Sequence, residues 1–140
     1  MRITGNVKYK LLDHTADVRI QAFGTDLNEI FENSAYALFD QIVDLSTVVP
    51  KGEEKIEIEA RSADSLLVDY LNELIFIESA MGILFSSFSV NVRGTHLRSS
   101  ARGEKIDRKR HLLKDDVKAV TYHMLELNIE KGYAKFIIDV

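Results

Sequence analysis

The sequence predicts an α+β fold, a mostly antiparallel sheet with two main helices packed on one face. One observation is the order of segments, which reads strand, strand, helix, strand, helix and then four strand-like stretches. The other is periodicity, because apolar residues alternate in the strand segments and recur every three or four positions in the helical ones. The chain has 140 residues, without a linker or a repeat. Residues 1–140 are therefore expected to form a single domain.

The first three elements surround the segment DHTAD at residues 13–17. Alternating apolar residues before and after this segment predict two strands, at 7–11 and 18–22. A helix is expected from a cap at Thr25 or Asp26 to Ile42, because its apolar residues share one side at helical spacing.

A strand and a second helix complete the first half of the chain. Pro50 and Gly52 mark a loop, after which apolar residues alternate with glutamates at 56–60 and predict a strand. The second helix is expected at about 64–81, with Gly82 as its C-terminal stop.

The remaining segments are strand-like. A strand is expected at 88–92, with Gly94 turning the chain into a hairpin partner. The long stretch 117–129 changes its apolar parity between Met124 and Leu125, which indicates a bulge or bend. The last strand, 133–140, has apolar residues on both faces, and this favours a central place in the sheet.

Composition excludes several classes of protein. The sequence has no cysteine, so disulfides, thiolate metal sites and cysteine nucleophiles are excluded. No stretch approaches the roughly 18 apolar residues that a membrane span needs, and the N-terminus lacks the apolar stretch of a signal peptide. An intracellular, cytoplasmic protein without a membrane partner is expected.

Charge is distributed unevenly. The segment 93–110 has seven basic and two acidic residues and carries a charge of +5, which leaves −9 for the rest of a chain of net charge −4. A basic segment on an acidic body indicates contact with a phosphate or an acidic partner, or a solvated face around a loop. Glu104, Asp107 and His111 either hold this loop in place or contact the partner.

Carboxylates at the two ends of the chain are the main candidates for a site. Asp13 and Asp17 lie four positions apart in DHTAD, and Asp139 precedes the C-terminal Val140. Caps on the turn are one interpretation of the first pair. If the last strand lies beside the strands that flank DHTAD, however, these carboxylates and the α-carboxylate converge, and they would need a cation or protons to neutralise them.

The type of ligand narrows the choice of ion. The converging groups are hard oxygens without sulfur, so Ca²⁺, Mg²⁺ or Mn²⁺ fits better than zinc or copper. His14 is either a nitrogen ligand or a hydrogen-bonding residue that fixes the loop.

Several motifs resemble those of the archease family, the small accessory proteins of the tRNA-splicing RNA ligase. Together they span almost the whole chain: DHTAD at 13–17, FGTDLNEIFENSAYALF at 23–39, GEKID at 103–107, His111, VKAVTYH at 117–123 and FIIDV at 136–140. Their combination is specific, whereas any one of them alone would be weak.

The resemblance implies a metal site whose ligands are Asp17, Asp139 and Val140, with calcium the first choice of divalent cation. Asp13 is then expected to support the ligands, and Asp13, His14 and Lys118 are candidates for such support or for partner contact. The resemblance also implies a protein without catalytic residues of its own. Its partner would be the tRNA-splicing RNA ligase, whose guanylylation and multiple turnover it promotes, with at most indirect or weak contact with tRNA or GTP.

Two other functions compete with this one. A free-standing metal-dependent phosphohydrolase would use the carboxylate cluster, but the sequence has no convincing nucleophile and no glycine-rich phosphate loop. An RNA-binding chaperone would use the basic segment, but the chain is acidic overall and that segment has no clear aromatic stacking motif. Lys118 either supplies a positive charge to a phosphate or carboxylate, or reaches solvent.

Overall fold

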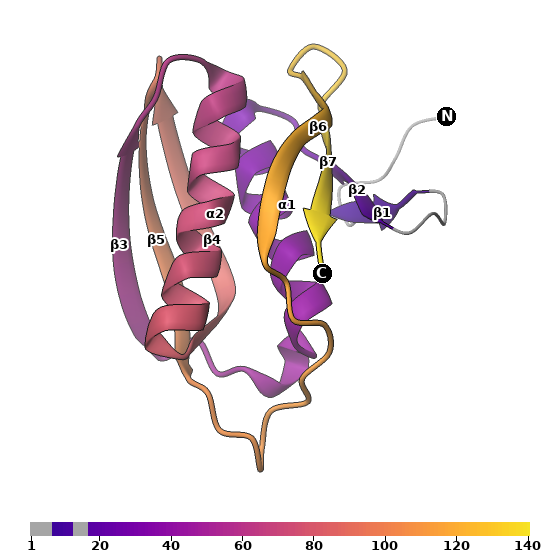
Figure 1. Cartoon of the computed structure of the whole chain (residues 1–140). Coiled ribbons are helices and arrows are strands. Elements are labelled where there is room, and N and C mark those ends of the chain that lie inside the picture. Colours follow the sequence, from indigo (N-terminus) through magenta and orange to yellow (C-terminus); the bar gives the residue numbers. More distant parts are fainter. Residues whose placement is uncertain (1–6, 13–16) are drawn as a thin grey trace.

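The structure of the protein is a computed structural model, and it describes residues 7–12 and 17–140. It contains two α-helices, a short 3₁₀-helix and seven strands (Figure 1). Their bounds are β1 Tyr9–Leu11, β2 Val18–Phe23, α1 Leu27–Ile42, η1 Leu45–Thr47, β3 Gly52–Glu59, α2 Ala63–Met81, β4 Ile83–Arg93, β5 His96–Lys105, β6 Ala119–Asn128 and β7 Tyr133–Asp139.

The α+β class, the antiparallel strands and the two main helices are confirmed. The strands divide between two sheets, one ordered β1-β2-β7-β6 and the other β3-β5-β4. Each helix contacts strands of both sheets, and Figure 1 shows the helices between them. The apolar core lies in this space, with Phe31, Phe39, Tyr70, Phe85 and Phe136 among its largest fully buried side chains.

Both helices begin at the caps that local sequence supplies. Asp26 caps α1, and its carboxylate accepts a hydrogen bond from the backbone N–H of Glu29. Ser62 and Ser65 form a reciprocal capping box at the start of α2. Gly82 ends α2 in the left-handed conformation at φ 65°, as its position predicts, since glycine adopts this conformation without a Cβ penalty.

β7 occupies the centre of its sheet, as its two apolar faces predict. It pairs with β2 on one side and with β6 on the other, both antiparallel. The predicted bulge in β6 is also confirmed, because the register shifts between Thr121 and Glu126. The C-terminal residues of β7 therefore have a neighbouring strand on each side.

Side chains from the helices close the outer edges of two strands. The amide of Asn72 in α2 accepts a hydrogen bond from the N–H of Val120 and donates one to its carbonyl, which covers part of the edge of β6. Asn28 and Glu32 of α1 accept hydrogen bonds from the N–H groups of Val92 and Val90 in β4. These contacts join the helices to the sheets through the backbone as well as through the core.

No helix in the described residues is long and apolar enough to span a membrane.

Candidate functional site

The C-terminal end of β7 brings together residues from three distant parts of the sequence. Val18 of β2 pairs with Ile138, so Asp17 and Asp139 each lie one residue beyond this pair. On the other side Ala119 pairs with Asp139, and the backbone N–H of Lys118 donates a hydrogen bond to the Asp139 carbonyl at 2.7 Å. The register thus places Asp17, Lys118, Asp139 and the terminal Val140 at one end of the sheet.

The side chains at this end are accessible to a ligand or a partner. Asp17, Lys118 and Asp139 are exposed, and Val140 is 44% exposed, whereas Ile137 and Ile138 are buried. Burial therefore ends with the strand, because both faces of β7 are buried up to Ile138 and the residues after it are exposed. We refer to Asp17, Lys118, Asp139 and Val140 as the carboxylate tip.

The donors of the carboxylate tip fit a hard cation by their chemistry. The side chains of Asp17 and Asp139 offer carboxylate oxygens, the donor type that such a cation prefers. Among the residues that the structure describes, however, no group of three or more His, Cys, Asp or Glu side chains is positioned to hold a metal ion. Asp13 and His14 lie outside the described residues, and the ligand set that includes Asp17, Asp139 and Val140 stays a prediction.

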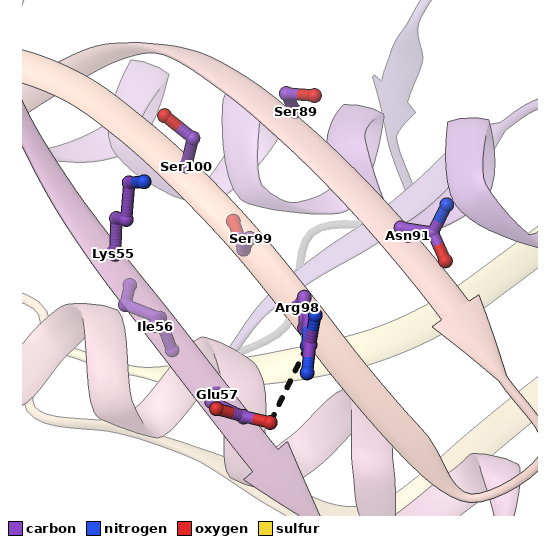
Figure 2. A pocket seen from close by; sticks show the side chains of 8 residues that line it. All are labelled: Lys55, Ile56, Glu57, Ser89, Asn91, Arg98, Ser99 and Ser100. Carbon is purple, nitrogen blue, oxygen red and sulfur yellow. Dashed lines mark hydrogen bonds and ion pairs between the residues drawn. The ribbon is translucent and has the colours of Figure 1, made fainter.

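The basic segment 93–110 does not form one patch. Its first half becomes β5, the hairpin partner of β4, and the outward-facing Arg98 and Arg102 make ion pairs with Glu57 and Glu53 of β3. Figure 2 shows Arg98 and Glu57 in a shallow pocket on this outer sheet face. Other polar side chains from all three strands line the same pocket: Lys55, Ser89, Asn91 and Ser100. The β3 glutamates thus balance much of the positive charge of β5.

The second half of the basic segment is organised by a buried carboxylate. Glu104 is 6% exposed, and Arg110 donates two hydrogen bonds to it at 2.7 and 2.8 Å. The N–H of Val49 donates a third at 2.8 Å. These donors, with Arg110 the strongest, hold the pKa of Glu104 well below its usual range.

His111 also contacts Glu104. The N–H of Asp107 donates to Nδ1 of His111, so Nδ1 is an acceptor and the proton lies on Nε2, which is 2.8 Å from the Glu104 carboxylate. His111 itself is 3% exposed. Of the two interpretations left open by the sequence, the structure therefore supports Glu104, Asp107 and His111 as the residues that hold the loop in place.

The sequence did not predict one exposed feature of β6. Tyr122 and Met124, in the bulge, are 57% and 54% exposed. The parity change indicated where the bulge lies, but periodicity alone does not show that large apolar side chains point out of it.

Comparisons with known proteins agree with the sequence motifs. Residues 9–140 match the archease protein family. The chain is 42% identical over 138 residues to "Protein archease" of Methanothermobacter thermautotrophicus, covering 94% of this chain and 98% of that one. It is 39% identical to "Protein archease" of Pyrococcus abyssi, covering 89% of each.

The fold is also similar to a solved structure. The solution structure of Methanobacterium thermoautotrophicum protein 1598 matches with a TM-score of 0.81 and 39% identity, covering 95% of this chain and 99% of that one. The motifs, the sequence relatives and the fold therefore agree, and this chain belongs to the archease protein family.

Proposed function

We propose that this protein is a non-catalytic, cytoplasmic activator of the tRNA-splicing RNA ligase, promoting its guanylylation and its multiple turnover. Family membership supports an accessory role. The observation that carries the proposal is the register of β7, which brings Asp17, Asp139, Val140 and Lys118 together although they come from three parts of the sequence. We propose that the carboxylate tip is the part of the protein that acts on the ligase.

The chemistry of the carboxylate tip suits this role. A divalent cation, calcium in the first place and Mg²⁺ or Mn²⁺ as alternatives, would neutralise the clustered negative charge when bound. Asp17, Asp139 and the α-carboxylate of Val140 would hold it, with Asp13 and His14 as supporting or partner-contacting residues. Because β7 has a paired strand on each side, its last residues are held by the sheet and can keep a defined arrangement.

Lys118 adds a positive charge at the same place. Its side chain is exposed, while its backbone is hydrogen-bonded to Asp139. We propose that the ammonium group contacts a phosphate or a carboxylate in the complex with the ligase, where the surrounding protein excludes water and strengthens the charge interaction. Contact of the protein with tRNA or GTP would then be indirect or weak.

A reconstituted nucleotidylation assay tests this proposal. A limiting amount of the protein is added to purified ligase with GTP, and the ligase–GMP adduct and the number of ligation turnovers are measured. The proposal predicts that both increase and that the protein alone leaves GTP unchanged. Hydrolysis of GTP by the protein alone, at a rate that Asp17→Ala abolishes, would instead support the phosphohydrolase.

The RNA-binding chaperone makes a different prediction. It requires RNA affinity without the ligase, and that affinity should fall steeply with salt. The ion pairs of Arg98 and Arg102 with β3 glutamates argue against it, because two of the basic side chains already have acidic neighbours. Reversing Lys105, Arg108 and Lys109 to glutamate tests three further exposed basic residues and leaves the structural Arg110 intact.

A further inference from the structure

The bulge of β6 inserts three extra residues into the edge of the four-stranded sheet. Thr121 pairs with Ile137 and Glu126 pairs with Lys135, so four residues of β6 face the single residue Phe136 of β7. Val120 before the bulge is buried, and Leu125 at the end of the bulge and Leu127 after it pack against the core. Tyr122, His123 and Met124 are all exposed.

The backbone of the bulge is strained at Met124. This residue has a φ of 57°, and it is the only non-glycine residue with a positive φ in the described part of the chain. A side chain with a Cβ disfavours this conformation, which glycine and asparagine adopt more readily. The backbone conformation of Met124 therefore lowers the stability of the fold. Burial of the side chain offsets little of this cost, because the side chain is 54% exposed.

Protection of the sheet edge does not explain these residues. A bulge by itself keeps an edge strand from pairing with another chain, so this protection does not require large apolar side chains. This bulge instead presents an aromatic and a thioether side chain, which are enriched in the centres of protein interfaces. The N–H of His123 donates a hydrogen bond to Oγ1 of Thr121, which fixes the backbone where the bulge begins.

The bulge also lies close to the carboxylate tip. Thr121 pairs with Ile137, which is two residues before Asp139, so at about 3.3 Å per residue the bulge begins within about 10 Å of the tip. A standard protein interface covers about 800 Å² on each partner, a patch of roughly 16 Å radius. One partner that receives the carboxylate tip would therefore cover the bulge as well.

We propose that Tyr122 and Met124 are apolar anchors that insert into a hydrophobic depression of the ligase, beside the place that receives the carboxylate tip. This inference rests on the function proposed above and assigns different roles to the bulge and to the carboxylate tip. The bulge provides affinity, and the carboxylate tip provides activation. Changes in the bulge should weaken binding, whereas changes in the tip should reduce the stimulation reached at saturation.

The test measures binding of the protein to purified ligase by calorimetry for wild type, Tyr122→Ser and Met124→Asn. Each variant is expected to bind at least about tenfold more weakly, the size of effect seen for interface anchors. Met124→Asn should melt at or above the wild-type temperature, because asparagine tolerates the left-handed conformation. At saturating concentration both variants should stimulate the ligase as wild type does.

Ile129→Ser is the matched control. Ile129 is 52% exposed but follows β6 at its far end, outside the bulge, so its replacement should leave binding unchanged. Wild-type affinity in both bulge variants, or equal weakening by Ile129→Ser, would overturn the inference while the proposed function stands. Absence of binding by wild type would overturn the proposed function, and this inference with it.

Discussion

Val18 and Ile138 form the last pair of the antiparallel ladder between β2 and β7, and the next residue outward on each strand is an aspartate. Two carboxylates from opposite ends of the chain are thereby placed at one end of the sheet. Val140 follows directly on β7. This pairing is the structural basis of the proposed carboxylate tip.

A divalent cation should stabilise the folded protein through this tip. An ion that binds only the folded state adds about 2.7 kcal/mol to the free energy of unfolding at a hundred times its dissociation constant. Asp17→Asn should abolish most of this gain, because it removes a charged oxygen ligand. Thermal melts with Ca²⁺, Mg²⁺ and Mn²⁺ would measure the effect and rank the ions.

Glu130→Gln is a suitable control for that titration. Glu130 is exposed in the turn between β6 and β7, at the opposite end of the sheet from the tip. Its replacement removes the same charge and should leave the cation effect unchanged. An equal loss in both variants would indicate that the ions act on the overall negative charge.

Glu104 should make stability depend on pH in the acid range. Arg110, Val49 and His111 hold its pKa below the ordinary value of 4.5 in the folded state, so the unfolded chain binds the proton first. The contribution of the ionised Glu104 to the free energy of unfolding is therefore complete above pH 4.5 and is lost as the pH falls below that value.

Urea unfolding of wild type and Glu104→Gln at several pH values would measure this contribution. The two proteins should differ by a constant amount between about pH 6 and 8, with wild type the more stable, and the difference should shrink in acid. A stability difference that is the same at every pH would show that Glu104 stabilises the fold through packing and not through its charge.

Asn72→Ala should destabilise the fold by about 1–3 kcal/mol, because it leaves the N–H and carbonyl of Val120 without their side-chain partners. Chemical denaturation measures the change. Asn91→Ala is the control, since Asn91 is exposed on the outer face of the other sheet, and its loss should matter by less than about 0.5 kcal/mol. Equal effects would argue against the edge-closing role of Asn72.

Gly103→Ala should destabilise the protein by about 3 kcal/mol, the upper end of the usual cost of overpacking, because the clash is with the backbone. A Cβ at Gly103 would lie 1.7 Å from the carbonyl oxygen of Leu84, a backbone atom that cannot move without its strand. Gly52 pairs with Gly103 across the sheet, but a Cβ there would meet its nearest atom at 3.3 Å. Gly52→Ala should therefore unfold at a much higher denaturant concentration than Gly103→Ala.

Local patterns predicted the elements of the fold more completely than its assembly. The end of α2 at Gly82 and the central place of β7 follow from signals within a few residues, namely a glycine stop and apolar residues on both strand faces. The division into two sheets does not, because it depends on pairings such as Val18 with Ile138 that span almost the whole chain.

The candidate site shows the same limit. The carboxylates were predictable as residues, but only the register of β7 brings Asp17 and Lys118 to its end. The burial of Glu104 depends on Arg110 and His111, which fold back onto it. The sequence could not predict this, because a solvated loop has a similar mixture of acidic and basic residues. For Met124, the parity change predicted the bulge, while the left-handed backbone and the exposed side chain required the structure.

The central claim is that the carboxylate tip activates the ligase, and stimulation of nucleotidylation at saturating protein tests it most directly. The comparison uses wild type, Asp17→Ala and a chain extended beyond Val140, which moves the α-carboxylate away from Asp139. The account predicts that both changes lower the maximal stimulation about tenfold or more, a loss of about 1.4 kcal/mol in coupling, with the fold intact. Equal stimulation by all three proteins would contradict it.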